Sequence, residues 1–566
     1  MINRKYAFFA AIAIIFMLCI GAKSANLQKP YTIMIYMNGS DLESDFGLAT
    51  DDLAEMLDSG LQSRNANVLI LTGGTYRWLN DAIPATECII WELADGWLNE
   101  IESMGNIDMG NPATLRDFIK FGLANYPADK YGLIMWDHGG GSIAGFGHDE
   151  NFNDSSLSLA DMKQAFEEAG LGGQKLEFLG FDACLMATVE MAILASDYAK
   201  VLIAAEDLEP GEGWDYHFLD VLNDTPRMSG FELGKVIVDT FIDFFGEDSD
   251  EILTLSVTDL SRVKPVMYAM GDLMAKASEE MHNYCFFPLA HRRAVTKTFG
   301  EGSPRDNYAD MVDIGDMALQ LYDMFPQEAE AVLQALENCV VYNRHNSDID
   351  LWGLSTFYIY GGKSQGTPSL ATYAALGMDK NYTIYLQEFF QNLKRSAQEP
   401  APITHTELAL WRPLLNNHRM IGLLQTDSAG DFLWPTINGH PVVLFPITTT
   451  ANARKYAIPA KVNDREVDII ASFTTCTPQG RIIGSRNIGE SVFQKGYDPI
   501  LPGDKIAIYY IEYDFSNNNE TWLAGKTFTV QNNMQLTWGP APAIHMLGLR
   551  LTDARNNITY QNPHTN

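Results

Sequence analysis

Short apolar runs alternate with longer amphipathic runs from residue 31 onward, and this alternation constrains the fold more than any other feature of the 566-residue chain. Nearly continuous apolar runs suit strands that are buried on both faces, and the amphipathic runs between them suit crossover helices. The pattern is typical of a mainly parallel sheet with helices on its faces, an α/β fold. The predicted strands span 31–37, 67–74, 87–93, 131–137, 175–181 and 201–207. The predicted helices between them span 51–60, 112–126, 159–170 and 186–199.

The second half of the chain changes character. A further unit is predicted with a helix at 234–246, a strand at 251–260 and a helix at 262–281, and strand character returns at 350–362. Composition shifts near 395–405, where "SAQEPAPITHT" predicts a linker. The runs beyond it are short, rich in Val, Ile, Thr and Tyr, and separated by turns, which predicts a small all-β module, a sandwich or a barrel.

The N-terminus carries a targeting pattern. Arg4 and Lys5 precede fifteen apolar residues, Phe8 to Ala22, and small residues follow at 22–24. This predicts a secretory signal peptide cut near Ser24 or Ala25, because a membrane span needs about twenty apolar residues. Cys19 is not expected to carry a lipid anchor, since no small residues precede it. We therefore predict an exported protein, extracellular or periplasmic, without stable membrane insertion.

These observations divide the chain into three predicted segments. Residues 1–24 form the signal peptide, residues 25–395 the α/β domain, and residues 396–566 the C-terminal β-rich domain.

The chain is strongly acidic. Its formal charge of −33 becomes −36 without residues 1–24, which hold three basic and no acidic side chains. Such a charge repels nucleic acid and anionic membranes, and it attracts cationic substrates or metal ions. Solubility of an exported protein explains the same acidity equally well.

Five cysteines remain after the predicted cut, and they are widely scattered. They are Cys88, Cys184, Cys285, Cys339 and Cys476. An odd number at such spacings does not resemble a disulfide framework and leaves at least one thiol unpaired. Cys184 is the candidate.

Two polar motifs follow predicted strands. His138 lies in "MWDHGGG" after the strand at 131–137, and Cys184 lies in "FDACLM" after the strand at 175–181. One predicted helix separates these strands, so a right-handed crossover makes them parallel and adjacent. Ligands bind at the carboxyl ends of such strands. Either these are two ordinary strand ends, with a buried packing cysteine, or they form one thiol active site.

The local sequence suits thiol chemistry. Cys184 is expected at the start of a helix at 185–198, whose dipole and free N–H groups would favour the thiolate. The imidazole of His138 can accept the thiol proton and later protonate a leaving amine. The N–H groups of Gly139 and Cys184 are the expected donors to the oxyanion of a tetrahedral intermediate.

These motifs resemble those of the clostripain family of caspase-like cysteine peptidases. The resemblance rests on the His-Gly pair after one apolar strand and on "DACLM" after a later one. "YTIMIYMNGSDLES", "AAEDLEPGEGWDY", "FLWPTINGHPV", "YAIPAKVND" and "LPGDKIAIYY" also resemble segments of that family. The resemblance implies a caspase-like fold, with His138 as the catalytic base and acid and Cys184 as the nucleophile.

The resemblance also implies a substrate preference. Family members with an aspartate two residues before the nucleophile cleave after Arg, and in some cases Lys, and Asp182 matches that position. Such a carboxylate would pair with a guanidinium, although Asp182 could instead cap the following helix. Glu206, Asp207, Glu209 and Glu212 are candidates for a second carboxylate, and Glu212 is preferred. Trp214 and Tyr216 suit a pocket wall or the core.

Activation and cofactors are less constrained. Several relatives cut themselves at a basic residue between His and Cys, but 142–162 contains no Lys or Arg, and Lys163 lies in a predicted helix. A single working chain is therefore expected, unless it is cut elsewhere. No cofactor is required, but because some relatives use calcium, calcium is a candidate. The acidic residues Asp149, Glu150 and Asp154 lack the spacing of a calcium loop and suit a solvated face.

No metal site is predicted. His217, His282 and His291 lack metal-ligand spacing with Cys, Asp or Glu, and the sequence contains no HExxH motif. The sequence therefore predicts an exported cysteine endopeptidase that acts on protein or peptide substrates after Arg, and in some cases Lys. Two alternatives stay open, a thiol-dependent transpeptidase on the same dyad and a catalytically silent secreted binding protein.

Overall fold

The computed structural model describes residues 28–398 and 425–550, apart from short internal gaps. The gaps are 247–248, 250–252, 283–288, 291, 294–295, 302–307, 348, 361–365, 427–431, 443, 450–452, 475–479, 489–495, 515–518, 532–533 and 541–548. The predicted signal peptide and most of the predicted linker lie outside the described residues.

A nine-stranded sheet forms the centre of the N-terminal part, and its strand order is β13-β10-β9-β8-β5-β1-β2-β3-β4. The five strands from β9 to β2 are mutually parallel. The strands span β1 (Lys29–Asn38), β2 (Ala66–Gly73), β3 (Cys88–Ala94), β4 (Trp97–Gly105), β5 (Ala128–Trp136), β8 (Phe178–Asp182), β9 (Val201–Ala204), β10 (Thr254–Asp259) and β13 (Val340–His345). The predicted α/β sheet is confirmed.

The apolar runs form strands because both faces of the sheet are covered. In β1, Met34 and Tyr36 belong to one hydrophobic core, while Ile33 and Ile35 belong to the core on the opposite face. This alternation follows from the two-residue period of a strand. Continuous apolar sequence is therefore required here, as expected for parallel strands buried between helices.

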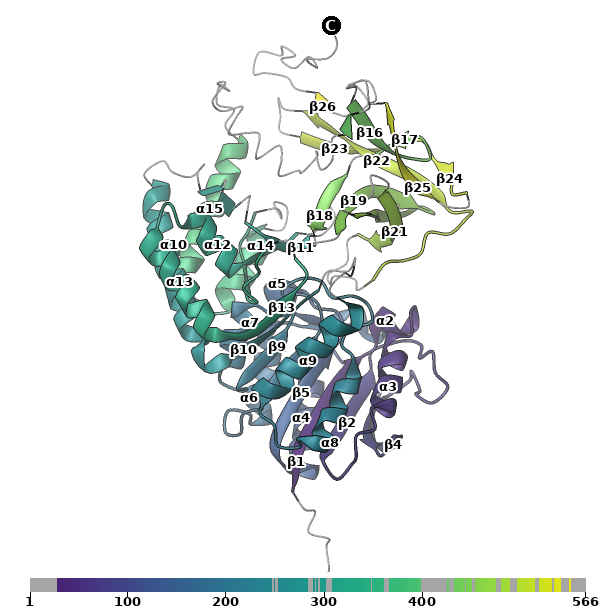
Figure 1. Cartoon of the computed structure of the whole chain (residues 1–566), viewed down its shortest axis with the longest axis vertical. Helices are drawn as coiled ribbons and strands as arrows, with labels where there is room; N and C mark the ends of the chain where they lie inside the picture. The colour runs from purple at the N-terminus through teal and green to yellow at the C-terminus, as the bar shows by residue number, and fades with distance from the viewer. Residues whose placement is uncertain are drawn as a thin grey trace, which may run out of the picture.

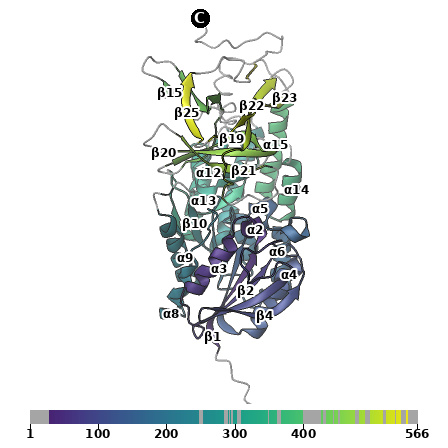
Figure 2. The same ribbon diagram turned by 90° about the vertical axis from the view of Figure 1, so that its right-hand side faces the viewer.

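Helices cover both faces of the sheet (Figures 1 and 2). Side chains of α4 and α6 pack in one core, and side chains of α3 and α9 pack in the other. The α-helices span α2 (Ser40–Ser44), α3 (Leu48–Asp58), α4 (Pro112–Asn125), α5 (Gly141–Ala144), α6 (Leu159–Ala169), α7 (Val189–Ala195), α8 (Val221–Asp224), α9 (Gly230–Phe245), α10 (Val263–His282), α12 (Ile314–Leu321), α13 (Pro326–Cys339), α14 (Gly366–Ala375) and α15 (Lys380–Gln398). Short 3₁₀ helices span η1 (Glu150–Phe152), η2 (Tyr216–Asp220) and η3 (Leu260–Arg262).

The N-terminal part also contains two small sheets that are separate from the large sheet. Strands β6 (Phe146–Asp149) and β7 (Ser155–Leu157) form an antiparallel pair between the motifs of His138 and Cys184. Strands β11 (Thr298–Glu301), β12 (Tyr308–Asp313) and β14 (Ser355–Phe357) form a three-stranded antiparallel sheet.

The predicted C-terminal all-β module is also confirmed, and it occupies one end of the molecule (Figure 1). Its strands span β15 (Gln425–Thr426), β16 (Phe432–Ile437), β17 (His440–Pro441), β18 (Phe445–Thr449), β19 (Ala453–Val462), β20 (Arg465–Thr474), β21 (Gly480–Asn487), β22 (Lys505–Asp514), β23 (Asn519–Ala524), β24 (Phe528–Thr529), β25 (Gln535–Pro540) and β26 (Leu549–Arg550). The module has its own hydrophobic core, which includes Ile458, Val467 and Ile469.

The sheet differs from the prediction at its edges. The predicted strand at 87–93 is β3, but it runs antiparallel to β2, and β4 follows it as a hairpin partner that the sequence reading did not include. Most residues of β4 are exposed, and an exposed strand does not need the continuous apolar sequence by which the central strands are recognised. The chain turns back at Asp95 and Gly96, which both have positive φ angles.

The predicted domain boundary at 395 falls in the last turn of α15, which ends at Gln398. Among the residues that the structure describes, no helix is both long enough and apolar enough to cross a membrane.

Candidate active site

Strands β5 and β8 bring the His138 and Cys184 motifs to the same edge of the sheet. The two strands are parallel neighbours, with Trp136 in register with Asp182. The register continues past the strand ends, because the N–H of Asp137 donates to the carbonyl of Asp182 over 3.4 Å. His138 and Cys184 therefore follow paired positions, and the predicted strand-helix-strand neighbourhood is confirmed.

Gly139 lies directly against the backbone of Cys184. A Cβ atom at Gly139 would overlap the carbonyl oxygen of Cys184 and would lie 3.0 Å from its nitrogen. Only a residue without a side chain allows this approach. The close approach places the two predicted oxyanion donors, the N–H groups of Gly139 and Cys184, on neighbouring backbone segments.

The glycine loop after His138 folds back on itself. The N–H of Gly147 donates to the carbonyl of His138 over 3.0 Å, and the N–H of Gly140 donates to that of Gly145 over 2.7 Å. Gly141 has a φ of 64°, which suits glycine. The loop therefore presents His138 from a closed, hydrogen-bonded turn.

The prediction that Cys184 begins a helix is wrong. Helix α7 begins five residues later at Val189, and the hydroxyl of Thr188 caps it by accepting from the N–H of Met191. Leu185 has a φ of 65°, a left-handed conformation that a helix cannot continue through. The helix dipole therefore does not act on Cys184, because the effect falls off within the first turn.

Cys184 is instead held by the loop after β9. The N–H groups of Leu185 and Ala187 donate to the carbonyls of Asp207 and Ala205. The thiol sulfur of Cys184, which is fully buried, accepts from the N–H of Glu209 over 3.3 Å. The loop after β9, and not a helix end, therefore supplies a backbone donor to the sulfur of Cys184.

Asp41 is a site residue that the sequence reading did not single out. Its Oδ1 lies 2.7 Å from Nε2 of His138, which is almost fully buried. Burial would raise the pKa of Asp41, but the charge of His138 and the hydrogen bond to it lower that pKa to about 2. Asp41 therefore stays ionised and fixes the imidazole through Nε2.

A second carboxylate binds the backbone of His138. Asp137 is fully buried and accepts the N–H groups of His138 and His148 over 2.6 and 2.7 Å. Burial raises its pKa to about 7, although the charge of His138 and these hydrogen bonds oppose the rise. The ring of His148 lies edge-on to that of His138, with centroids 6.1 Å apart.

Asp182 lies at the end of β8 and is fully buried. Its Oδ2 accepts the N–H of Trp214 over 3.3 Å and the hydroxyl of Tyr216 over 3.0 Å. The alternative reading, a cap on the helix after Cys184, does not hold, because the N–H of Leu185 donates to Asp207 and the helix begins later. Asp182 therefore faces the loop that carries Trp214 and Tyr216.

Of the four acidic candidates in that loop, Glu209 lies nearest to this group. It is buried, its Oε1 accepts the indole N–H of Trp214 over 3.4 Å, and its own N–H reaches Cys184. Glu212, the preferred candidate, is exposed. Glu206 pairs with the buried Asp313, and Asp207 accepts the N–H of Gly300.

The acidic residues between the two motifs do not gather around one point. Asp149 accepts the N–H groups of Met109 and Asn151, Glu150 accepts groups of Ser44, Thr75 and Tyr76, and Asp154 pairs with His148. Each carboxylate thus has separate partners. A calcium requirement stays a prediction.

Two other cysteines in the described part of the chain are buried. Cys88 and Cys339 are free thiols, and burial raises the pKa of each to about 12. Both are therefore protonated and inert at neutral pH. Cys285 and Cys476 lie outside the described residues.

Comparisons with known proteins identify the class. The fold is a central, mainly parallel sheet with helices on both faces, and a histidine and a cysteine follow adjacent strands of it, as the resemblance to caspase-like cysteine peptidases implies. A model of the clostripain family matches residues 35–399, most of the chain. The chain belongs to the clostripain family, which confirms the resemblance read from its motifs.

Among curated proteins, the chain is similar to clostripain of Hathewaya histolytica, with 26% identity over 225 residues. That alignment covers 34% of this chain and 41% of the relative, less than half of each. Among solved structures, it is similar to a secreted C11 cysteine protease from Bacteroides thetaiotaomicron in complex with an irreversible peptide inhibitor, with 15% identity and a TM-score of 0.48 over 61% of this chain and 98% of that one. It is also similar to an inactive zymogen C11 protease from Parabacteroides distasonis, with 19% identity and a TM-score of 0.45 over 58% of this chain and 92% of that one.

Proposed function

We propose that this protein is an exported cysteine endopeptidase that hydrolyses peptide bonds after Arg, with Lys as a second candidate, and that His138 and Cys184 are its catalytic dyad. One observation carries the proposal: the register of β5 with β8, continued by Gly139 against Cys184, joins a histidine and a buried thiol at one sheet edge. The family of the chain supports the same chemistry.

In this mechanism the thiolate of Cys184 attacks the substrate carbonyl, and His138 takes the thiol proton. Asp41 on Nε2 holds the ring so that Nδ1 exchanges the proton. The N–H groups of Gly139 and Cys184 stabilise the oxyanion. His138 then protonates the leaving amine, and water hydrolyses the thioester that forms on Cys184.

Substrate preference is assigned to Asp182. A guanidinium or ammonium group would pair with its carboxylate, and Trp214 and Tyr216 would line the pocket beside it. We place Glu209 ahead of Glu212 as the second carboxylate, because Glu209 is buried beside Cys184 and Trp214 whereas Glu212 is exposed. Discrimination against neutral side chains would follow, because a neutral side chain offers the buried carboxylate of Asp182 no opposite charge.

We also propose that the enzyme works as one chain. The segment between the two motifs is folded into β6, β7 and α6. Lys163 lies within α6, whose start is fixed by a capping box between Ser158 and Asp161. Cleavage there would require the helix to unfold, so the purified active protein should migrate as a single band after denaturing electrophoresis.

The test uses fluorogenic arginyl, lysyl and leucyl amide peptides with the parent protein, Cys184→Ala and Asp182→Asn. We expect Cys184→Ala to abolish cleavage, and Asp182→Asn to lower kcat/KM for the arginyl peptide by about tenfold or more while affecting the leucyl peptide little. Glu212→Gln is the matched control for loss of one carboxylate from this region. Equal cleavage by Cys184→Ala would refute the dyad.

The same experiment separates the alternatives. An arginyl chloromethyl ketone should label Cys184, as located by mass spectrometry; absence of both labelling and cleavage would favour a silent binding protein. Ligation of the acyl product to an added amine, in place of hydrolysis, would favour a transpeptidase. Export is tested by the mature N-terminus, which should begin near residue 25.

A further inference from the structure

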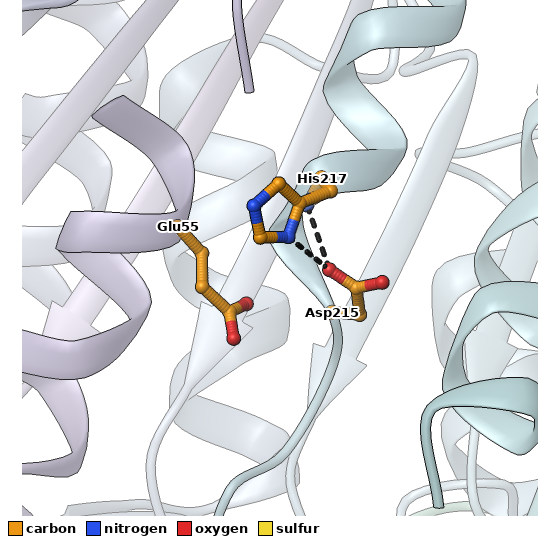
Figure 3. A group of neighbouring side chains, drawn as sticks. All are labelled: Glu55, Asp215 and His217. Atoms are coloured by element: carbon orange, nitrogen blue, oxygen red, sulfur yellow. Dashed lines mark hydrogen bonds and ion pairs between the residues drawn. The ribbon is translucent and has the colours of Figure 1, made fainter. Parts of the chain in front are cut away.

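Three potential metal ligands meet beside the proposed substrate pocket. They are Glu55 on α3, Asp215, which caps η2, and His217 within η2 (Figure 3). One ligand atom from each lies within 4.8 Å of the other two. No other group of three or more His, Cys, Asp or Glu side chains in the described part of the chain meets this criterion.

Glu55 and Asp215 each retain an oxygen for an additional partner. Oε2 of Glu55 accepts the N–H of Tyr216 over 3.0 Å, and Oδ1 of Asp215 accepts the N–H of His217 over 3.0 Å and lies 2.7 Å from its Nδ1. The second carboxylate oxygens, Oε1 and Oδ2, take part in neither contact. The imidazole is about half exposed, so an ion can reach it from solvent.

The charge of this group is not balanced by protein cations. A third carboxylate, Asp58, lies 3.8 Å from Nε2 of His217. No Lys or Arg of the described residues forms an ion pair with Glu55, Asp58 or Asp215. A divalent cation would relieve the repulsion among these carboxylates.

We propose that Glu55, Asp215 and His217 bind a divalent transition-metal ion of the zinc type. One imidazole and two carboxylates are a ligand set that zinc accepts, with water in the remaining position, whereas calcium and magnesium select oxygen ligands alone. Sequence spacing could not show this site, because Asp215 and His217 are two residues apart but Glu55 comes from a helix 160 positions earlier.

The position of the ion suggests what it does. Tyr216 lies between the two ligands of the loop; its N–H binds Glu55, and its hydroxyl binds Asp182. An ion at this site would therefore tie the loop to α3 and fix the pocket wall against Asp182. This effect on substrate binding rests on the proposed function, whereas binding of the ion does not.

The decisive measurement is calorimetric titration of ZnCl₂ into the Cys184→Ala protein, in which the reactive thiol cannot bind zinc. We expect one site, and at least about tenfold weaker binding in Glu55→Gln and His217→Ala on the same background. Glu55→Gln keeps a side-chain oxygen that can accept the N–H of Tyr216. Weaker zinc binding by this variant would therefore not be caused by loss of that hydrogen bond. Asp224→Asn, an exposed carboxylate in the next helix, is the matched control and should bind as Cys184→Ala does.

Two outcomes would overturn the site: no binding to Cys184→Ala, or binding that His217→Ala leaves unchanged. The same titrations are carried out with CaCl₂ and MgCl₂. Calcium binding that His217→Ala leaves unchanged would overturn the assignment to zinc. Replacing zinc by cobalt should give visible absorption bands that disappear in His217→Ala. None of these measurements depends on peptidase activity.

A separate measurement addresses the pocket wall. In the active parent, chelation of the ion should raise KM for the arginyl peptide more than it lowers kcat, and Glu55→Gln should not respond to the chelator. An identical KM before and after chelation would refute the structural role of the ion while leaving the calorimetric result intact.

Discussion

At the scale of single residues, Asp41 decides how His138 is held. The carboxylate comes from α2, 97 positions before the histidine, and its Oδ1 lies 2.7 Å from Nε2. In the proposed mechanism, the ionised Asp41 would stabilise the imidazolium that forms when His138 takes a proton. Asp41 would then act through His138 as a positioning residue.

Asp41→Asn should keep a hydrogen bond to Nε2 but remove the charge. Hydrogen bonds to charged groups contribute about 1.5–3 kcal/mol, so we expect kcat/KM for the arginyl peptide to fall by about 10- to 100-fold. The pH profile of kcat/KM should also shift, which a loss of folding would not produce. Asp45→Asn, an exposed neighbour, serves as the control; equal loss in both variants would contradict the role of Asp41.

Gly139 is the other residue on which the site depends. Gly139→Ala should place a methyl group into the backbone of Cys184, which cannot move cheaply. We expect the free energy of unfolding to decrease by about 1–3 kcal/mol, and the labelling rate of Cys184 to fall. Urea unfolding and alkylation kinetics measure the two effects. Gly172→Ala, with nothing within 4 Å of its added Cβ, should change neither.

Residue types and spacing predicted only part of this site. His138 and Cys184 were predictable because one strand-helix-strand unit joins them, and such units have fixed handedness. Asp41 lies in α2, which directly follows β1, so only the position of β1 beside β5 brings this carboxylate to the site. Glu209 and Glu212 are three residues apart, and sequence does not tell which of two loop side chains turns inward.

At the scale of elements, the apolar runs of the sequence predict the positions of the central strands. They do not predict where each helix begins, because local backbone geometry determines that residue. The stretch "MATVEMAILASDYA" predicts a helix from 186, yet α7 begins at Val189 because Leu185 is left-handed and Thr188 provides the cap. The bonds from 185 and 187 to the loop after β9 compete with helix formation. Such long-range pairing is invisible to helix periodicity.

Thr188→Ala tests this arrangement. Loss of the cap should lower the free energy of unfolding by about 1 kcal/mol, measured by urea denaturation. The rate of alkylation of Cys184 by iodoacetamide should stay as in the parent, because α7 begins five residues after Cys184. A changed rate at unchanged folding would contradict this and restore the helix as an influence on the thiol.

At the scale of the whole molecule, several buried carboxyl groups make stability depend on pH. Burial raises the pKa of Asp137 to about 7 and that of Asp313 to about 6, and it raises the pKa of Glu206 well above its ordinary value. Glu206 and Asp313 share a hydrogen bond, and their mutual repulsion adds to the rise for Glu206. The native state therefore binds more protons than the unfolded chain between about pH 4 and 7.

Stability should then fall as pH rises through this window, because ionisation costs more in the folded state. We expect a higher thermal midpoint at pH 5 than at pH 8, measured by calorimetry. Asp41 acts in the opposite direction: its pKa is lowered to about 2, so its contribution is present above about pH 4 and is lost below. Glu206→Gln should flatten the decline; an unchanged slope would contradict the assignment to this pair.

The backbone bonds from 185 and 187 to the loop after β9, together with the contact from Glu209 to Cys184, have a consequence for engineering. Cys184 and the loop that carries Glu209 share one set of hydrogen bonds, so neither segment can be exchanged alone. Replacing residues 205–209 by a foreign loop to change specificity would also change the hydrogen bonds that hold Cys184, and so the position of its sulfur. Successful exchanges should therefore import 183–187 and 205–209 as a matched pair.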